Sequence, residues 1–383
     1  GGKTAYEDFL TILLPHLAPG GRIVIAIENK YGLKYFAGCK EDHLGTYFSG
    51  IENYQAGGGV RTFGKTGLEK IFAACDVEEY HFYYPYPDYK FMTTIYGDER
   101  MPGKGELSNN LRNFDRDRML LFDEKAAFDG MLEEDLFRIF SNSYVAVIGK
   151  GFDTCYVKYS NDRAPQYAIR TEMIKNDNDV TFIRKIPLTE EAKEHVRSME
   201  AAYEGLKERY AGGKLEINTC KLVEEDSEVY AEFEFVKGVS LAERLDECLE
   251  QDDLDGFHKL FREYVERVSY NSEYPVADFD LIFANILVNG DTWTLIDYEW
   301  TFGKPMDVKE LAFRAIYCYI LEDEKRNKLN DNEIKLAVEY FKNQANDSKT
   351  KDELELVLGN DFIVFSNVTK MGKEEVLKKI ERT

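Results

Sequence analysis

Residues 278–300 read DFDLIFANILVNGDTWTLIDYEW, and this stretch decides how the C-terminal half of the chain is interpreted. Two short apolar runs, at 286–288 and 293–296, flank Asn289-Gly290-Asp291, which is typical of a tight hairpin turn. Three oxygen-bearing side chains surround these runs: Asp280, Asn285 and Asp297. The pattern predicts two strands joined by a turn, with the side chains of Asn285 and Asp297 side by side at the open end of the hairpin.

The spacing of these three residues indicates phosphoryl transfer. Such a reaction needs a carboxylate that accepts the proton of the attacking hydroxyl, and oxygen ligands that hold Mg²⁺ on the phosphates. Asp280 and Asn285 have the D-x-x-x-x-N spacing of a kinase catalytic loop, and Asp297 ends the next predicted strand. We therefore expect Asp280 to be the catalytic base, and Asn285 and Asp297 to bind Mg²⁺. The alternative is that all three are ordinary turn and cap residues.

A phosphotransferase of this kind also needs a lysine that pairs with the nucleotide phosphates. The run Phe182-Ile-Arg-Lys185 has the form of the strand that carries such a lysine, and a helix is expected over 189–210. We expect Glu200, beside the buried stripe of this helix, to pair with Lys185, and Glu204 is the second choice. A solvated helix face would carry the same glutamates.

The segment EFEFVKG at 232–238 is predicted to link two lobes. Its backbone would face an adenine ring, so we expect a nucleotide to bind beside three consecutive residues: Phe233, Glu234 and Phe235.

Residues 152–345 resemble the protein-kinase-like superfamily, and more narrowly its aminoglycoside- and sugar-kinase-like branch. The resemblance rests on Asn285-Ile-Leu-Val288 and on Ile296-Asp-Tyr-Glu-Trp300. It implies a two-lobed domain that binds ATP and Mg²⁺ and phosphorylates a hydroxyl group. Two features depart from the pattern. Ser160-Asn-Asp-Arg163 stands where a glycine-rich loop is usual, and Asp278 stands where a histidine is usual. The first departure leaves a pseudokinase open.

The N-terminal part carries a second pattern. Arg22–Ile27 (RIVIAI) is a continuous apolar run, which predicts a strand buried on both faces. Leu17–Asn29 resembles the region around the fifth strand of class I S-adenosylmethionine methyltransferases. The text AIENKYGLKY at 26–35 and YPYPDYK at 84–90 is similar to those associated with bacterial surface-glycan synthesis. Some relatives fuse such a domain to a kinase-like domain that modifies the end of an O-antigen polysaccharide.

This second resemblance covers residues 1 to 148 and implies the C-terminal part of a Rossmann-like domain. The glycine-rich loop that approaches the methyl donor would lie upstream of residue 1. We therefore expect the strand at Arg22–Ile27 to have an unpaired edge, and the chain to be part of a longer protein or its edge to be covered. S-adenosylmethionine would bind the complete protein. The resemblance also places three residues in an acceptor pocket: Asn29, Tyr31 and His43.

Residues 59–66 carry a competing motif. Gly59-Val-Arg-Thr-Phe-Gly-Lys-Thr66 matches the phosphate-binding pattern G-x-x-x-x-G-K-[ST]. That loop works because a buried strand delivers it and a helix N-terminus receives the phosphates. A helix is expected at 66–75, but Ile51–Gly58 is polar and glycine-rich rather than strand-like. The motif fails this test of context, and we do not expect it to bind phosphate.

Composition limits the classes of partner. The formal net charge is −22 at pH 7, which disfavours binding to nucleic acid. No apolar run is long enough to cross a bilayer, so no transmembrane segment is expected. The cysteines are scattered, which is typical of reduced thiols in the cytoplasm. Their positions are Cys39, Cys75, Cys155, Cys220, Cys248 and Cys318.

These observations predict an α/β plus α+β protein with a partial methyltransferase-like domain at 1–148, a kinase-like domain at 149–346 and a helical tail at 347–383. The predicted function is a transferase of surface-glycan synthesis that moves the γ-phosphoryl group of ATP to a sugar hydroxyl. The alternative is a pseudokinase scaffold attached to a methyltransferase, with methyl transfer as the main activity. Self-association and assembly with other glycan-synthesis proteins are left open.

Overall fold

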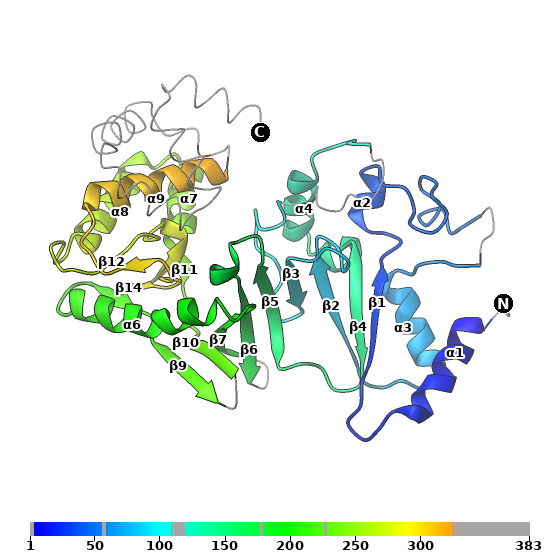
Figure 1. Ribbon diagram of the computed structural model, residues 1–383. Helices are drawn as coiled ribbons and strands as arrows, with labels where there is room; N and C mark the ends of the chain where they lie inside the picture. The colour runs from blue at the N-terminus through cyan, green and yellow to red at the C-terminus, as the bar shows by residue number, and fades with distance from the viewer. Residues whose placement is uncertain are drawn as a thin grey trace. The chain divides into compact units, whose positions relative to one another are not determined.

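The computed structural model describes residues 4–55, 59–108, 110, 119–176, 179–225, 228–323 and 326. The chain is mixed α/β, with a large antiparallel sheet and helices (Figure 1). It divides into two compact units. Unit 1 comprises Gly1–Ser160 and Arg170–Phe182, and unit 2 comprises Asn161–Ile169 and Ile183–Thr383. The helices expected near 331–343 and 370–383, and the tail expected at 347–383, lie outside the described residues.

The division comes later in the chain than the boundary expected after residue 148. The reason is a strand pairing. β5 (Thr154–Ser160) pairs antiparallel with β3 (Thr94–Gly97), with Thr94 opposite Lys158, so β5 belongs with the N-terminal unit.

The strands of unit 1 follow the order β1-β4-β2-β3-β5-β6. β4 (Ser143–Ile148), which the sequence analysis did not predict, lies between β1 (Ile23–Glu28) and β2 (Tyr80–Tyr86) and pairs antiparallel with both. β1 and β2 therefore run parallel to each other, and their carboxyl ends lie at the same edge of the sheet. β6 spans Ile169–Asn176.

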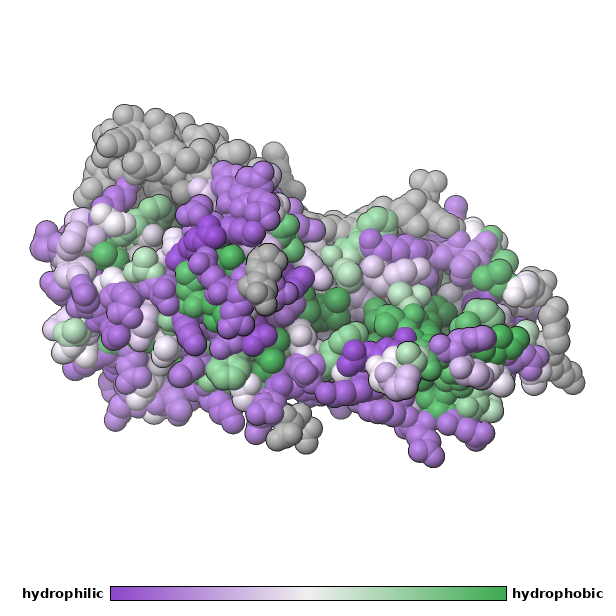
Figure 2. Space-filling model, turned by 60° about the horizontal axis from the view of Figure 1, so that its bottom comes forward, coloured by the Kyte–Doolittle hydropathy of each residue, from purple (hydrophilic) through white to green (hydrophobic). Residues whose placement is uncertain are grey.

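Among the described strands β1 lies at the edge of the sheet, as expected. The prediction that it is buried on both faces is wrong: its residues alternate, and the side chain of Val24 is 56% exposed. Further hydrophobic side chains are exposed on helix α1 (Ala5–Leu13), notably Phe9 and Ile12. Figure 2 shows hydrophobic residues gathered on part of the surface of unit 1, whereas the visible surface of unit 2 is more hydrophilic.

The core of unit 1 is strongly aromatic. Tyr84 of β2 and Tyr144 of β4 are fully buried, and their ring centroids lie 6.0 Å apart. Phe72 of helix α3 (Lys65–Ala74) packs in the same cluster. The remaining helical segments are α2 (Leu33–Phe36), α4 (Glu124–Glu133), α5 (Phe137–Phe140) and the 3₁₀ turn η1 (Leu14–His16).

The phosphate-loop motif at 59–66 does not have the required setting. α3 begins at Lys65, but the described residues before it form turns and one isolated bridge, between Phe63 and Asn29, rather than a strand. The ammonium of Lys65 forms an ion pair with the carboxylate of Glu69 at 3.1 Å. The rejection of this motif is therefore supported.

Three further strands follow the order β7-β10-β9, namely β7 (Asp179–Pro187), β10 (Glu228–Glu234) and β9 (Cys220–Glu225). Unit 2 contains β10, β9 and the part of β7 from Ile183 onward. Helix α6 (Lys193–Arg209) packs on β9 and β10 (Figure 1). Its buried residues Val196, Met199 and Leu206 follow helical spacing, which explains why the sequence predicts this helix well.

A second sheet in unit 2 has the order β11-β13-β14-β8. Its strands are β11 (Val239–Ser240), β13 (Ile286–Asn289), β14 (Thr292–Leu295) and β8 (Leu215–Ile217). A short ladder joins β12 (Ala277–Asp278) to β15 (Thr301–Phe302). The helices of this part are α7 (Leu241–Glu250), α8 (Leu254–Val268) and α9 (Val308–Glu322). Within the described ranges, every helix is too short or too polar to cross a membrane.

Candidate functional site

The predicted hairpin after Asn285 is present. β13 and β14 pair antiparallel, with Ile286 opposite Leu295 and Asn289 opposite Thr292. Gly290 has a φ of +60°, a left-handed conformation that glycine adopts without steric cost. At the open end, the backbone N–H of Ile296 donates to the carbonyl of Asn285 at 2.8 Å. The hairpin therefore holds Asn285 next to the residue that precedes Asp297.

Asp280 and Asn285 are in direct contact. The side-chain amide of Asn285 donates to the backbone carbonyl of Asp280 at 3.0 Å and lies 3.3 Å from its Oδ2. Arg314 of α9 donates to the other carboxylate oxygen of Asp280 at 2.6 Å. Burial raises the pKa of Asp280, and the guanidinium of Arg314 opposes that rise. A carboxylate with a raised pKa and a fixed orientation suits a general base.

Lys185 and Asp297 form the next pair. Lys185 lies on β7, is 5% exposed, and its ammonium group contacts the Asp297 carboxylate. Burial would lower the pKa of Lys185, but Asp297 and Glu299 raise it above its ordinary value. Asp297 has a φ of +54°, which is uncommon for a residue other than glycine and costs on the order of 1 kcal/mol or more. Such strained backbone positions cluster at functional sites.

Glu299 contacts several charged residues of the site. It stands in the Ile296–Trp300 motif, but no role was predicted for it from the sequence. One of its carboxylate oxygens accepts from Arg163 at 2.8 Å, and the other lies 3.3 Å from His195 and 3.5 Å from Lys185. Burial opposes ionisation of Glu299, yet Lys185, His195 and Arg163 together hold its pKa well below the usual range. Its position two residues after Asp297 is the one signal that could have identified it.

The expected ion pair between Lys185 and Glu200 is wrong for this structure. The carboxylate of Glu200 accepts from the backbone N–H of Leu222 in β9 at 3.0 Å. α6 packs on β9, so Glu200 is used to attach the helix to that strand. The second choice, Glu204, pairs with Lys207 at 3.4 Å on the exposed side of the same helix. Glu299 takes the place that the sequence analysis gave to Glu200.

The predicted linker contributes to two features. Phe233 is buried, 5.8 Å from Tyr298 between ring centroids, and the Lys185 ammonium lies 6.0 Å from the centre of its ring. Glu234 lines an open cavity of 320 Å³, together with residues that follow it and with Leu287 of β13. Phe235 is half-buried and is not among the residues that line the cavity.

Asp278 is a buried acid beside the catalytic loop. It is fully buried, and neither carboxylate oxygen has a hydrogen-bond partner among the described residues. Burial and the neighbouring Asp280 raise its pKa well above the ordinary value. The folded protein therefore favours the protonated form of this carboxyl group more than the unfolded chain does.

The oxygen donors fit Mg²⁺ bound together with a nucleotide. Within the described ranges, no group of three or more His, Cys, Asp or Glu residues could hold a metal. Mg²⁺, however, usually takes only one or two protein ligands and completes its shell with water and phosphate oxygens. The amide nitrogen of Asn285 donates a hydrogen bond to Asp280, so its amide oxygen is the atom that can bind a cation. Asp297 is 46% exposed at its side chain and supplies a carboxylate.

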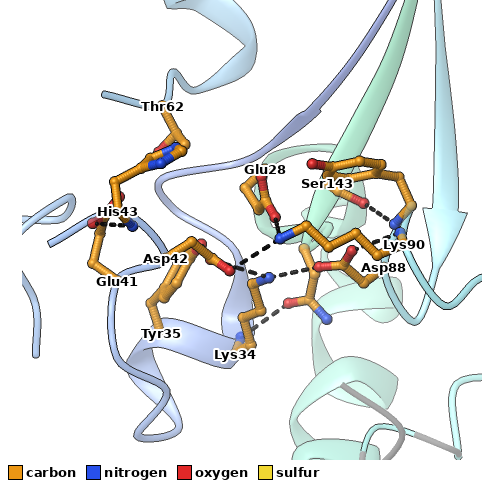
Figure 3. A network of polar contacts seen from close by, with 12 residues as sticks. Glu28, Lys34, Tyr35, Glu41, Asp42, His43, Thr62, Asp88, Lys90 and Ser143 are labelled. Atoms are coloured by element: carbon orange, nitrogen blue, oxygen red, sulfur yellow. Dashed lines mark hydrogen bonds and ion pairs between the residues drawn. The ribbon is translucent and has the colours of Figure 1, made fainter. Parts of the chain in front are cut away.

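In unit 1 the residues expected in an acceptor pocket have different settings. Asn29 is fully buried, and its side-chain amide is used by the backbone of Ile139, Ser141 and Tyr31. It is therefore a structural residue in this structure, which contradicts the pocket prediction. The backbone N–H of His43 donates to Glu41 at 2.9 Å, and His43 is exposed (Figure 3). The ring of Tyr31 lies beneath the ammonium of Lys30, at 4.6 Å.

A network of charged residues, buried or half-buried except for Lys90, lies beside these residues and was missed from the sequence (Figure 3). Lys34 lies 2.6 Å from Asp88 and 3.6 Å from Asp42, and Lys90 lies 2.5 Å from Glu28 and 3.3 Å from Asp42. Glu28 ends β1 and Asp88 follows β2, so the network lies at the carboxyl ends of two parallel strands.

A comparison with protein-family models found none that matches the chain, and a comparison with curated proteins found no significant match.

Proposed function

We propose that unit 2 is an ATP-dependent phosphotransferase that acts on a hydroxyl group of a sugar or glycan. The observation that carries the proposal is a set of contacts within one unit. Lys185 of β7 contacts Asp297, and the loop residues Asp280 and Asn285 contact each other at the open end of the β13–β14 hairpin. The acceptor class rests on the sequence resemblance to sugar-kinase-like proteins.

The geometry suits each role. Asp280 accepts the proton of the acceptor hydroxyl as the oxygen attacks the γ-phosphorus of ATP, and the bond from that phosphorus to the ADP oxygen breaks. Asn285 orients the Asp280 carboxylate. Lys185 holds phosphate oxygens, a role that requires it to exchange its contact with Asp297 for one with the nucleotide. Asn285 and Asp297 would hold Mg²⁺, which neutralises charge on the phosphates when it is bound.

The proposed nucleotide position follows from the linker. Residues 233–235 are the predicted contacts of the adenine ring. Phe233 lies beside Lys185, and Glu234 lines the 320 Å³ cavity. A base bound along this segment would lie near Lys185, whose ammonium is 6.0 Å from the centre of the Phe233 ring. This two-lobed, kinase-like arrangement is the finer interpretation of the mixed α/β fold.

For unit 1 we propose a place in a class I S-adenosylmethionine-dependent methyltransferase of surface-glycan synthesis. The support is the sequence similarity in residues 1–148, together with the charged network at the carboxyl edge of the sheet. Methyl transfer is the activity proposed for unit 1. We propose further that this protein acts in the cytoplasm.

Titration of Mg²⁺–ATP into the chain by calorimetry tests the proposal, with Asp297→Asn as the control. Metal-dependent binding that is lost in the control supports a nucleotide site, and an acceptor screen over sugars and glycans follows. Absence of binding at millimolar nucleotide would favour the second candidate, a non-catalytic scaffold. The observation behind that candidate is that Lys185 and Asp297 form an ion pair with each other.

A further inference from the structure

The loop between β5 and β6 has no glycine-rich sequence, yet it lies against the candidate site. Its residues 161–169 belong to unit 2. Arg163 donates to Glu299 at 2.8 Å, and its guanidinium carbon lies 5.2 Å from the centre of the Trp300 ring. A side chain from this loop therefore reaches the same carboxylate that Lys185 approaches.

The loop is anchored at a second point. The Tyr167 ring lies 5.2 Å from His195 and 5.3 Å from Trp300, between ring centroids. The hydroxyl of Thr189 donates to the carbonyl of Pro165 at 2.7 Å. These contacts fix the loop by side chains and hydrogen bonds, so the position of Arg163 is defined before any ligand arrives.

Arg163 has an unused donor. Its Nη2 atom is bonded to Glu299, but its Nη1 atom is buried and has no hydrogen-bond partner among the described residues. A buried guanidinium nitrogen without an acceptor is costly, on the order of 1–3 kcal/mol. The Arg163 side chain as a whole is 29% exposed, so a small ligand can approach it.

The charges around Glu299 place two cations side by side. Arg163 contacts Oε1 and Lys185 approaches Oε2, so an ammonium and a guanidinium flank one carboxylate. Lys185 also contacts the carboxylate of Asp297, so this pair of cations adjoins the candidate metal ligand. Paired cations beside a Mg²⁺ ligand suit the oxygens of a polyphosphate.

We propose that Arg163 binds a phosphate group of the nucleotide together with Lys185, and so supplies from its side chain the contact that a glycine-rich loop makes with its backbone. This inference rests on the proposed function of unit 2. Glu299 acts as the positioning residue, because it holds both cations at a fixed separation. The absence of a glycine-rich loop then indicates a different phosphate contact rather than a lost one.

The test compares the affinities of Arg163→Gln and wild-type protein for Mg²⁺–ATP and for adenosine, measured by calorimetry. A hydrogen bond to a charged group contributes about 1.5–3 kcal/mol, which corresponds to a loss of ATP affinity of about 10- to 100-fold. Adenosine affinity should be unchanged, because adenosine has no phosphate. Arg163→Lys should fall between wild type and Arg163→Gln. Arg197→Gln is the matched control, since Arg197 pairs with Glu194 and Glu224 on the exposed side of α6.

The possible outcomes separate the two proposals. If wild-type protein binds ATP and Arg163→Gln binds it equally well, the inference about Arg163 is wrong while the proposed function stands. If Arg163→Gln loses ATP and adenosine affinity to the same degree, Arg163 has only a structural role. If wild-type protein binds neither compound, the proposed function fails and the inference fails with it. A thermal melt of each variant verifies that it is folded.

Discussion

The ammonium group of Lys185 contacts the carboxylate of Asp297, although 112 residues separate them in the chain. The contact joins β7 to the end of the β13–β14 hairpin. It means that the candidate phosphate-binding cation and the candidate metal ligand neutralise each other in this structure. A nucleotide with its Mg²⁺ would replace this ion pair by two others, between Lys185 and phosphate and between Asp297 and Mg²⁺. Breaking the original pair would therefore cost little electrostatic free energy.

Asp280→Ala should remove phosphoryl transfer without removing the nucleotide. Loss of a general base typically lowers the rate by about 100- to 10,000-fold. The affinity for Mg²⁺–ATP should stay close to that of wild type, because Asp280 is proposed to contact the acceptor hydroxyl. Steady-state kinetics with the identified acceptor, together with calorimetry, measures both quantities. Transfer at the wild-type rate by Asp280→Ala would contradict the role assigned to this residue.

Glu200→Gln and Glu299→Gln should behave differently. The amide oxygen of glutamine can still accept from Leu222, so Glu200→Gln should change stability by less than about 0.5 kcal/mol. Glu299→Gln leaves Lys185 and Arg163 without their shared carboxylate, and breaking a buried ion pair costs about 3–5 kcal/mol. Urea unfolding gives the stabilities, and nucleotide titration shows whether the site survives. Equal effects of the two substitutions on stability and on nucleotide binding would support the predicted pairing of Glu200 with Lys185.

The pH dependence of phosphoryl transfer should report Asp280. The base must be ionised, and burial raises its pKa, so activity should fall on acidification at a higher pH than for an ordinary aspartate. Arg314 lowers this pKa, whereas the nearby Asp297 and Glu299 raise it. Arg314→Gln should therefore move the acidic limb of the kcat/KM profile upward by about 1–3 pH units. An unchanged limb in this variant would show that another group controls the profile.

Asp278→Asn should stabilise the protein more at neutral pH than at acidic pH. The pKa of Asp278 is raised in the folded state, so the folded state holds its proton more tightly than the unfolded state does. Asp278 therefore contributes a penalty that grows as the pH rises above the ordinary pKa of an aspartate. Asparagine cannot ionise and removes that penalty, with a gain on the order of 1 kcal/mol at neutral pH. Thermal unfolding at both pH values measures it, and a gain independent of pH would contradict the explanation.

Local patterns in the sequence predicted much of unit 2. The hairpin at 286–295 follows from two apolar runs around a glycine-containing turn, and α6 follows from apolar residues at helical spacing. The proximity of Asn285 to Asp280 follows from their spacing in one short loop. These features depend on residues that are near one another in the chain, and periodicity records such information well.

Other features depend on contacts between distant segments, and no local pattern records them. Glu200 and Glu299 are both plausible partners of Lys185 from composition alone, and only the packing of α6 on β9 decides between them. The resemblance to methyltransferases placed Asn29 in an acceptor pocket. Its actual partners are backbone groups at Ile139 and Ser141, more than a hundred residues later.

β4 has a consequence for how unit 1 folds. β1 and β2 do not pair with each other, and each reaches the sheet through β4, with Ile23 opposite Ile148 and Tyr80 opposite the same residue. A ribosome must therefore synthesise residues up to about Ile148 before β1 can join its neighbour. Pairings between such distant segments require closure of a long loop and are slow to form. Until then the apolar residues of β1 cannot pair with β4. A chaperone that shields them would raise the yield of folded protein.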